Sequence, residues 1–299
     1  MRKPLSLTHT IAVLGLTLLP LTVAAADGVA PGFQNRVFVD AQKQERKYVL
    51  FVPYKLETTK RPPLLLFLHG AGERGNNGID QIMVGLGPAV WKQKSNFPFV
   101  TIFPQCHTNS NWQVDTADTQ AALAMMRQAE QEFKTDPDRV YITGLSMGGS
   151  GSWSIAAKHP DLAAAIVPMC GRGELADAKK LTEAQLPVWN FCGDKDREAT
   201  VQFSRQMQEA LKTAGADSRY TEYPGVGHNC WDNAYGTAEL FTYAQLLFLG
   251  RQIGGQCLRH SGTVHLAAGK NADEESQVNA GGPGTSLTPP DHGRCGNIW

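Results

Sequence analysis

The stretch VYITGLSMGGSGSW, residues 140–153, decides the fold. It begins with apolar and β-branched residues typical of a buried strand, and a helix is expected to start directly after Ser146. Each glycine in a helix interior costs about 1 kcal/mol relative to alanine. The four glycines around this junction therefore indicate that the turn meets a geometric requirement other than helix stability.

Residues 144–148, Gly-Leu-Ser-Met-Gly, fit the pattern G-x-S-x-G, and their place between a strand and a helix predicts a nucleophile elbow. In that turn the serine backbone is strained and its hydroxyl stands above the sheet. Larger side chains two positions to either side would collide, which accounts for Gly144 and Gly148. The N–H of Met147 and the start of the helix both point at an anion forming beside Ser146. The alternative is a glycine-rich turn with an idle serine.

A serine hydroxyl needs an adjacent base, and the base needs a group that orients it. His228 is the strongest candidate base because PGVGHNCW places it on a loop just past the last predicted strand. His69 and His107 also lie at a strand end or on a loop, whereas His159 ends a helix. A purely structural histidine is the alternative for His228.

The orienting acid is expected between the serine and the histidine in sequence. FCGDKDREA follows a predicted strand and offers Asp194 and Asp196. Carboxylates at such a place also cap helices or lie in solvated turns. The residues alone leave both aspartates open.

Short apolar runs alternate with amphipathic segments, which predicts an α/β protein with a mostly parallel sheet of about eight strands and helices on both faces. The first two strands are expected to form a hairpin, and the lack of a long insertion predicts no large cap. The predicted strands are Arg36–Asp40, Arg46–Pro53, Pro63–His69, Phe99–Phe103, Arg139–Thr143, Ala164–Met169, Pro187–Phe191 and Arg219–Pro224, and the predicted helices are Thr116–Phe133, Thr200–Ala214 and Thr237–Arg251.

Both ends of the chain differ from this catalytic domain, which is assigned to residues 27–254. Residues 1–26 carry Arg2 and Lys3, an apolar run too short to span a membrane, and three alanines, the pattern of a cleaved signal peptide. The product is therefore expected to be secreted or periplasmic, with no membrane span in the mature chain. Residues 255–299, rich in glycine, proline and small polar residues, are expected to form a flexible tail.

Charge and cysteine content exclude several classes of protein. Lys plus Arg and Asp plus Glu number 28 each, so no net field favours nucleic acid. All six cysteines follow the predicted cleavage point, which predicts two or three disulfides of unknown pairing. The sequence contains no CxxC or HExxH pattern, so no metal is expected, and nothing indicates a cofactor.

Residues 70–75 match the dinucleotide pattern G-x-G-x-x-G, but the match is isolated. That pattern requires a helix to start at this point, whereas Asn76, Asn77 and Gly78 prolong a loop. A dinucleotide site is therefore not expected.

Four motifs in order carry a family resemblance: HGAGERG (69–75), TGLSMGG (143–149), GDKD (193–196) and YPGVGHNCWD (223–232). Over about residues 46–251 the chain resembles the phospholipase/carboxylesterase-like branch of the α/β-hydrolases. That branch includes secreted esterases, polyhydroxybutyrate-depolymerase-like proteins and predicted peptidases. The resemblance implies an α/β-hydrolase fold.

The resemblance also implies roles for single residues. Ser146 matches the nucleophile, His228 the base and Asp196 the acid, while Ala71 and Met147 match the two residues whose N–H groups bind the oxyanion. The residues after the acid, 197–200, depart from the family's usual apolar pair and proline.

The predicted activity is hydrolysis of carboxylic esters through an acyl-enzyme, on small, bulky or polymer-linked substrates. Trp112, Trp153 and Trp231 are candidates to line a substrate groove, with core packing as the alternative. A serine peptidase, a non-catalytic binding protein and a transferase to sugars are rival functions, and the oligomeric state stays open.

Overall fold

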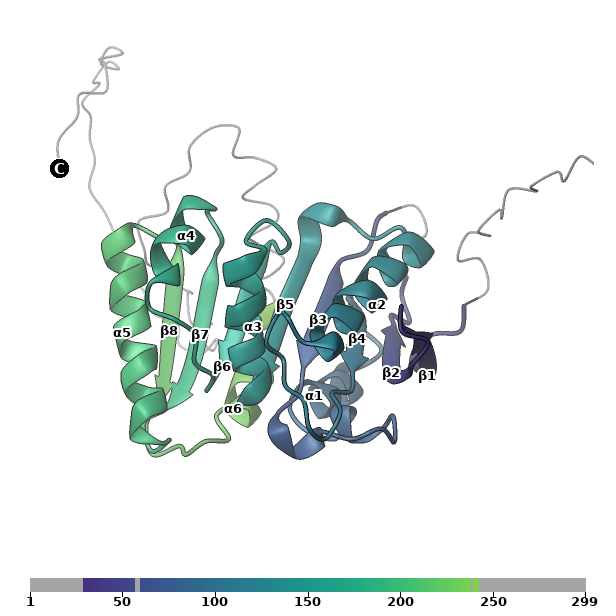
Figure 1. Ribbon diagram of the computed structural model, residues 1–299, viewed down its shortest axis with the longest axis horizontal. Coiled ribbons are helices and arrows are strands. Elements are labelled where there is room, and N and C mark those ends of the chain that lie inside the picture. Colours follow the sequence, from purple (N-terminus) through teal and green to yellow (C-terminus); the bar gives the residue numbers. More distant parts are fainter. Residues whose placement is uncertain (1–28, 57–59, 238, 242–299) are drawn as a thin grey trace, which may run out of the picture. The chain divides into compact units, whose positions relative to one another are not determined.

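The computed structural model describes residues 29–56, 60–237 and 239–241, which all belong to one compact unit (Figure 1). The predicted signal peptide, the predicted tail and most of the predicted helix Thr237–Arg251 lie outside the described residues. Within the described ranges, no helix is both long and apolar enough to cross a bilayer.

The described residues form one eight-stranded sheet in the order β1-β2-β4-β3-β5-β6-β7-β8. The hairpin β1–β2 is antiparallel, β2 pairs antiparallel with β4, and all other neighbours are parallel. The strands are β1 (Gly32–Val39), β2 (Glu45–Val52), β3 (Leu64–Leu68), β4 (Val100–Pro104), β5 (Val140–Leu145), β6 (Ala165–Met169), β7 (Val188–Gly193) and β8 (Ser218–Tyr223). The predicted strands and the predicted hairpin are confirmed.

The central strands were predictable from the sequence because they are fully buried. Every residue of β3, β4, β5, β6 and β7 is buried, as parallel strands covered on both faces require. The edge strand β8 is half-buried along its whole length.

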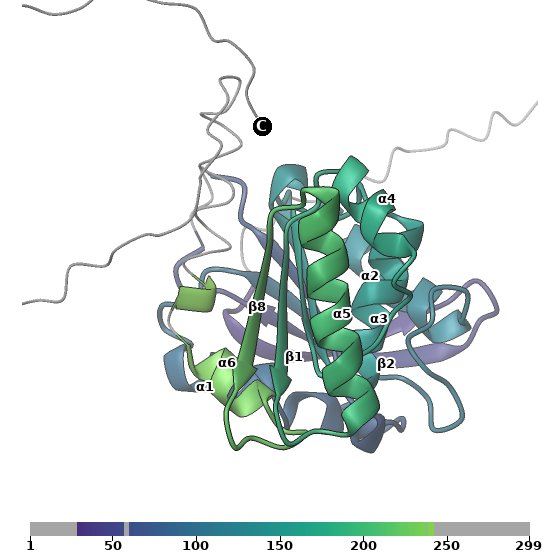
Figure 2. The same ribbon diagram turned by 90° about the vertical axis from the view of Figure 1, so that its left-hand side faces the viewer.

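Helices cover both faces of the sheet (Figure 2). One apolar cluster receives side chains from α2 (Ala117–Phe133), α3 (Met147–Lys158), α4 (Asp177–Glu183) and α5 (Glu198–Ala214). The cluster on the opposite face receives side chains from α1 (Leu86–Gln93) and α6 (Trp231–Gly236). Three short 3-10 turns complete the described elements: η1 (Ala71–Glu73), η2 (Asp80–Ile82) and η3 (Pro137–Arg139).

The predicted disulfides are wrong for the described part of the chain. Cys106, Cys170, Cys192 and Cys230 are all buried free cysteines. Each thiol packs as a small apolar side chain, and a domain of this size buries enough surface to be stable without covalent links. Cys257 and Cys295 lie outside the described residues.

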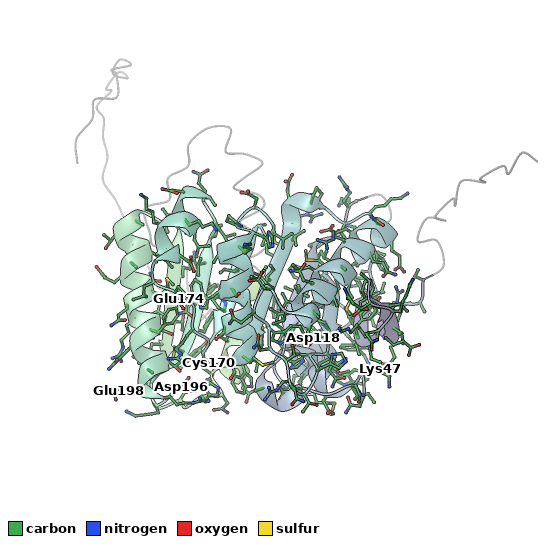
Figure 3. All side chains as sticks on the ribbon, viewed as in Figure 1. Lys47, Asp118, Cys170, Glu174, Asp196 and Glu198 are labelled. Atoms are coloured by element: carbon green, nitrogen blue, oxygen red, sulfur yellow. The ribbon has the colours of Figure 1, made fainter. Side chains whose placement is uncertain are left out.

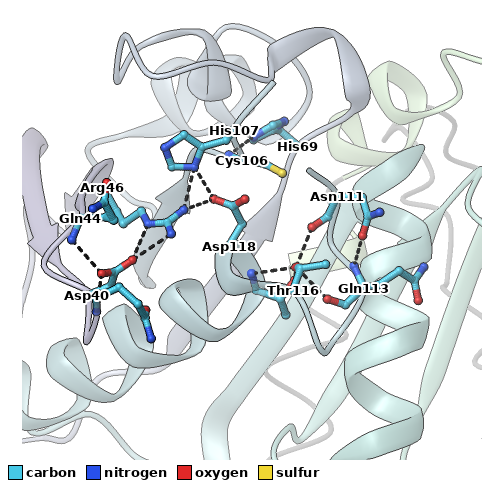
Figure 4. Close-up of polar contacts among 12 residues, drawn as sticks. Asp40, Gln44, Arg46, His69, Cys106, His107, Asn111, Gln113, Thr116 and Asp118 are labelled. Carbon is cyan, nitrogen blue, oxygen red and sulfur yellow. Dashed lines mark hydrogen bonds and ion pairs between the residues drawn. The ribbon is translucent and has the colours of Figure 1, made fainter. Parts of the chain in front are cut away.

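A buried ionic network ties β2 to the start of α2 (Figure 4). Arg46 donates from Nε to Asp40 Oδ2 at 2.9 Å and from Nη1 to Asp118 Oδ1 at 2.6 Å. His107 Nδ1 lies 2.7 Å from the same Asp118 oxygen. The side chains of Arg46 and Asp118 are only 9% and 5% exposed, so this guanidinium compensates a carboxylate that is largely shielded from water.

Arg46→Ala is expected to lower the free energy of unfolding by about 3–5 kcal/mol, because it removes the guanidinium that compensates the buried Asp118 charge and leaves that carboxylate with its contact to His107. Urea denaturation followed by circular dichroism measures this loss. Lys47, the next residue of β2, is exposed, and Lys47→Ala is the matched control with an expected change within about 0.5 kcal/mol. Equal effects of the two substitutions would contradict the role given to the network.

The carboxyl ends of the parallel strands meet at one edge of the sheet, where ligands bind in open α/β sheets. The loops that leave this edge after β3, β5, β7 and β8 carry all four motifs quoted above. The topology therefore brings these motifs together.

Candidate active site

Ser146 lies between β5 and α3 with φ 54° and ψ −113°, a conformation that a non-glycine residue adopts only under strain. Its backbone N–H donates to Met169 O at 2.9 Å, and its carbonyl accepts from the N–H of Ser150 at 3.0 Å. These two bonds hold the strained turn between β6 and the first turn of α3. The predicted elbow geometry is present.

The glycines around Ser146 are required by close backbone contacts. A Cβ at Gly144 would lie 2.4 Å from the carbonyl oxygen of Gly148, and one at Gly148 would lie 1.9 Å from that of Leu68. A Cβ at Gly149 would lie 2.4 Å from the carbonyl oxygen of Met169, so this glycine lets α3 approach the end of β6 closely.

Ser146, His228 and Asp196 form a hydrogen-bonded series. His228 Nε2 lies 2.8 Å from Ser146 Oγ, and His228 Nδ1 lies 2.9 Å from both Asp196 oxygens. Because a carboxylate only accepts, Nδ1 carries the proton and Nε2 is left to accept from the serine hydroxyl. The Asp196 side chain is 0% exposed and that of His228 is 32% exposed, so the series runs from the interior to an accessible ring.

The two aspartates that the sequence left open have different partners. Asp196 contacts His228, and its Oδ1 also accepts from the N–H of Arg197 at 2.6 Å. Asp194 Oδ1 instead accepts from the N–H of Gly225 at 2.7 Å and holds the turn after β8. The geometry favours Asp196 as the partner of the base.

The two residues expected to supply oxyanion donors each begin a helical turn. Ala71 is the first residue of η1, and Met147 is the first residue of α3. No bond described for this part of the chain uses either N–H. The loop before Ala71 packs on the nucleophile, since a Cβ at Gly70 would lie 3.7 Å from Ser146 Cβ. Their binding of an oxyanion stays a prediction, as do the catalytic roles of the three side chains.

Cys170, which the sequence analysis did not connect with the site, lies beside Asp196 at the end of the strands (Figure 3). Its Sγ, an Asp196 oxygen and a His228 nitrogen all lie within 4.8 Å of one another. Burial and the neighbouring Cys230 thiol raise the pKa of Cys170, so the thiol stays protonated at neutral pH. Asp196 and His228 already bond to each other, which leaves the cluster no free set of metal ligands.

The three candidate tryptophans have different surroundings. Trp112 and Trp153 are 1% and 2% exposed and belong to the core, so the alternative of core packing holds for both. Trp112 donates from Nε1 to His69 O at 3.0 Å, and Trp153 packs edge-on against Phe203. Trp231 is half-buried, and its ring packs edge-on against His228 with centroids 5.6 Å apart. Of these three tryptophans, Trp231 is the one that packs against a residue of the candidate active site.

His69 is buried, and desolvation lowers its pKa to about 4 from the usual 6.5. An unfolded chain takes up a proton at this histidine below pH 6.5, whereas the folded chain keeps it neutral until about pH 4. The unfolded state therefore binds more protons in this window, and stability falls as the pH drops from 6.5 to 4.

The contribution of His69 to this loss is expected to be roughly 3 kcal/mol at its full extent. Urea unfolding at pH 7 and pH 4.5 should show a larger loss for the wild-type chain than for His69→Asn, which has no titrating group there. The same pH dependence in both proteins would contradict the burial of a neutral imidazole at this site.

The strand order, the strained serine turn and the hydrogen-bonded Ser-His-Asp series define an α/β-hydrolase. The sequence profile of the dienelactone hydrolase family matches residues 85–237, about half of the chain, and the chain belongs to that family. A thermostable esterase of known structure is similar, with 31% identity and a TM-score of 0.66, over 72% of this chain and 62% of that one. The predicted fold class and the resemblance to the α/β-hydrolases are confirmed.

Two curated relatives are similar over shorter segments. A bifunctional acetylxylan esterase/xylanase of Neocallimastix patriciarum is 25% identical over 54% of this chain and 24% of its own length. Feruloyl esterase B of Neurospora crassa is 26% identical over 49% of this chain and 51% of its own length. The matched segments thus span about half or less of these relatives.

Proposed function

We propose that the chain is a carboxylic ester hydrolase in which Ser146 is the nucleophile, His228 the general base and Asp196 the orienting acid. The observation that carries the proposal is the continuous series from Ser146 Oγ through the His228 ring to Asp196, with contacts of 2.8 and 2.9 Å. Membership of the dienelactone hydrolase family and the esterase names of similar proteins support it.

The reaction follows from the geometry. His228 Nε2 takes the Ser146 proton as Oγ attacks the ester carbonyl, and the Ala71 and Met147 N–H groups bind the oxyanion. The imidazolium then protonates the departing alcohol, which leaves an acyl-Ser146. Water attacks this acyl group with His228 again acting as base, and the acid is released.

The proposed substrates are acetyl or aromatic acyl esters carried on a polymer, and the proposed location is outside the cytoplasm after removal of residues 1–26. Two features support this substrate class. The similar proteins include an acetylxylan esterase and a feruloyl esterase. The half-buried ring of Trp231 beside His228 offers an apolar face for an aromatic or sugar ring.

A fluorophosphonate probe and an ester panel test the proposal. The probe is expected to label the full chain at Ser146, as read by peptide mass spectrometry. Acetyl, feruloyl and short-chain aryl esters are expected to turn over faster than peptide substrates of matched length. Failure of the label at Ser146 would support a non-catalytic protein, and faster peptide cleavage would support a peptidase.

A further inference from the structure

The His69 ring is held at both nitrogens between two backbone segments. Its Nδ1 lies 2.6 Å from the carbonyl oxygen of Gly70, and its Nε2 accepts from the N–H of Cys106 at 2.9 Å. The side chain is buried, with the whole residue 1% exposed, and its neighbour Cys106 is drawn beside it in Figure 4. The mechanism described above does not use this ring.

These contacts fix the tautomer of His69. A backbone N–H only donates, so Nε2 must be the unprotonated nitrogen that accepts from Cys106. The ring is neutral around pH 7, because burial lowers its pKa to about 4. Nδ1 therefore carries the proton and donates it to Gly70 O.

The Gly70 carbonyl belongs to the same planar peptide group as the Ala71 N–H, and in a trans peptide the two bonds point in opposite directions. We propose that His69 is a positioning residue that aims the Ala71 N–H at the oxyanion by holding the Gly70 carbonyl on the far side of that peptide. This inference rests on the proposed function, which makes Ala71 an oxyanion donor.

Further hydrogen bonds hold His69 and the loop 69–75 to Trp112 and Cys106. The carbonyl of His69 accepts from Trp112 Nε1 at 3.0 Å, so the residue is held by main chain and side chain. The N–H of Gly75 donates to the carbonyl oxygen of Cys106 at 2.8 Å. Both ends of the loop 69–75 are thus bonded to Cys106. Arg74 holds the Ala71 carbonyl and Ser110 O through its guanidinium, whereas the His69 ring contacts the carbonyl of the peptide group that carries the Ala71 N–H.

Two substitutions of His69 each keep one of the two hydrogen bonds that its ring makes. In His69→Asn the side-chain amide lies at the place of Nδ1 and still donates to Gly70 O. In His69→Gln the longer side chain reaches the place of Nε2 and accepts from Cys106, while the donor to Gly70 is lost. We expect kcat for an aryl ester to fall about 10- to 100-fold in His69→Gln. In His69→Asn, kcat should stay within about threefold of the value for the unsubstituted chain. KM should stay within about threefold in both variants.

Inhibitor affinities show whether the loss arises at the oxyanion. Affinity for a trifluoromethyl ketone, which forms a tetrahedral oxyanion on the serine, should fall in proportion to kcat in His69→Gln. Affinity for the corresponding alcohol, which forms no oxyanion, should stay within about twofold. The inhibition constants of the ketone and the alcohol do not depend on the fraction of folded protein in the sample. Equal losses for both compounds would overturn the inference.

Ala71→Pro removes the proposed donor while His69 stays in place. Proline suits the first residue of a helical turn, and Gly70 before it is extended, with φ −77° and ψ −178°. We expect this variant to lose about 10²–10³-fold in kcat. Adding His69→Gln to it should then cost less than about twofold, because the group that His69 positions is gone. Additive losses would show that His69 acts elsewhere.

A measurement on the unsubstituted chain covers the case in which the His69 variants do not fold. The nitrogen chemical shifts of His69 should report the Nδ1–H form without change between pH 5.5 and pH 8. An Nε2–H form, or titration near pH 6.5, would overturn the inference. Its failure is distinguishable from failure of the proposed function, because Ser146 labelling and ester turnover by the unsubstituted chain do not depend on the His69 tautomer.

Discussion

Ser146→Ala is expected to lower kcat for a carboxylic ester on the order of 10⁶-fold, the scale seen when the nucleophile of a serine hydrolase is removed. The loss follows because no other hydroxyl is bonded to His228 Nε2 within the described residues. The residual rate should come from substrate binding and the oxyanion donors alone. Steady-state assays with an aryl acetate at high enzyme concentration measure it.

Ser152→Ala is the matched control for the nucleophile. Ser152 lies on α3 less than two turns from Ser146, and its hydroxyl donates to the carbonyl oxygen of Gly148 at 3.0 Å. Loss of this bond should cost about 1 kcal/mol of stability and leave kcat within about threefold. Equal activity of Ser146→Ala and the unsubstituted chain would remove the proposed mechanism and favour a binding protein that keeps the fold.

Asp196→Asn is expected to lower kcat about 10⁴-fold while the fold is retained. An asparagine amide can donate to His228 Nδ1 and so stabilise the tautomer in which Nε2 carries the proton. Nε2 would then be unable to accept the proton of Ser146. The deficit should be largest near neutral pH, and a pH–rate profile of kcat/KM checks it.

Asp194→Asn tests which of the two neighbouring aspartates acts as the acid. The asparagine oxygen at 194 can still accept from the N–H of Gly225, so kcat is expected to stay within about threefold. A larger loss from Asp194→Asn than from Asp196→Asn would reverse the assignment of the acid. The sequence motif alone left this choice open, and the contact with His228 favours Asp196.

Much of the sheet was predictable because its strands are continuous apolar runs between turn residues, as LLLFL of β3 illustrates. Helices α2 and α5 were predictable for a similar reason, since each has 17 residues with a buried stripe. Helix α1 was missed because it has only 8 residues and includes Gly87 and Pro88, which weaken any helical pattern. Helix α6 has only 6 residues, too few to show a period.

The contacts around the hydrogen-bonded series of Ser146, His228 and Asp196 were less predictable than the series itself. Motif order pointed to Ser146 and His228, but nothing in the sequence placed the Cys170 thiol beside Asp196, because that proximity depends on the packing of the loops after β6 and β7. In the sequence, His69 is simply a histidine at the end of a predicted strand. The one signal for it was its position before Gly70 in HGAGERG. Trp112 and Trp153 were indistinguishable from groove residues until their burial was known.

The tight meeting of α3 with the turn after β6 has a consequence for engineering. A Cβ at Gly171 would lie 2.2 Å from the Ser150 nitrogen, and one at Gly149 would lie 2.4 Å from the carbonyl oxygen of Met169. A mutational library should therefore tolerate few substitutions at these glycines and many at exposed loop positions such as Arg172. New substrate preferences are best sought by varying the exposed loops while these glycines are kept.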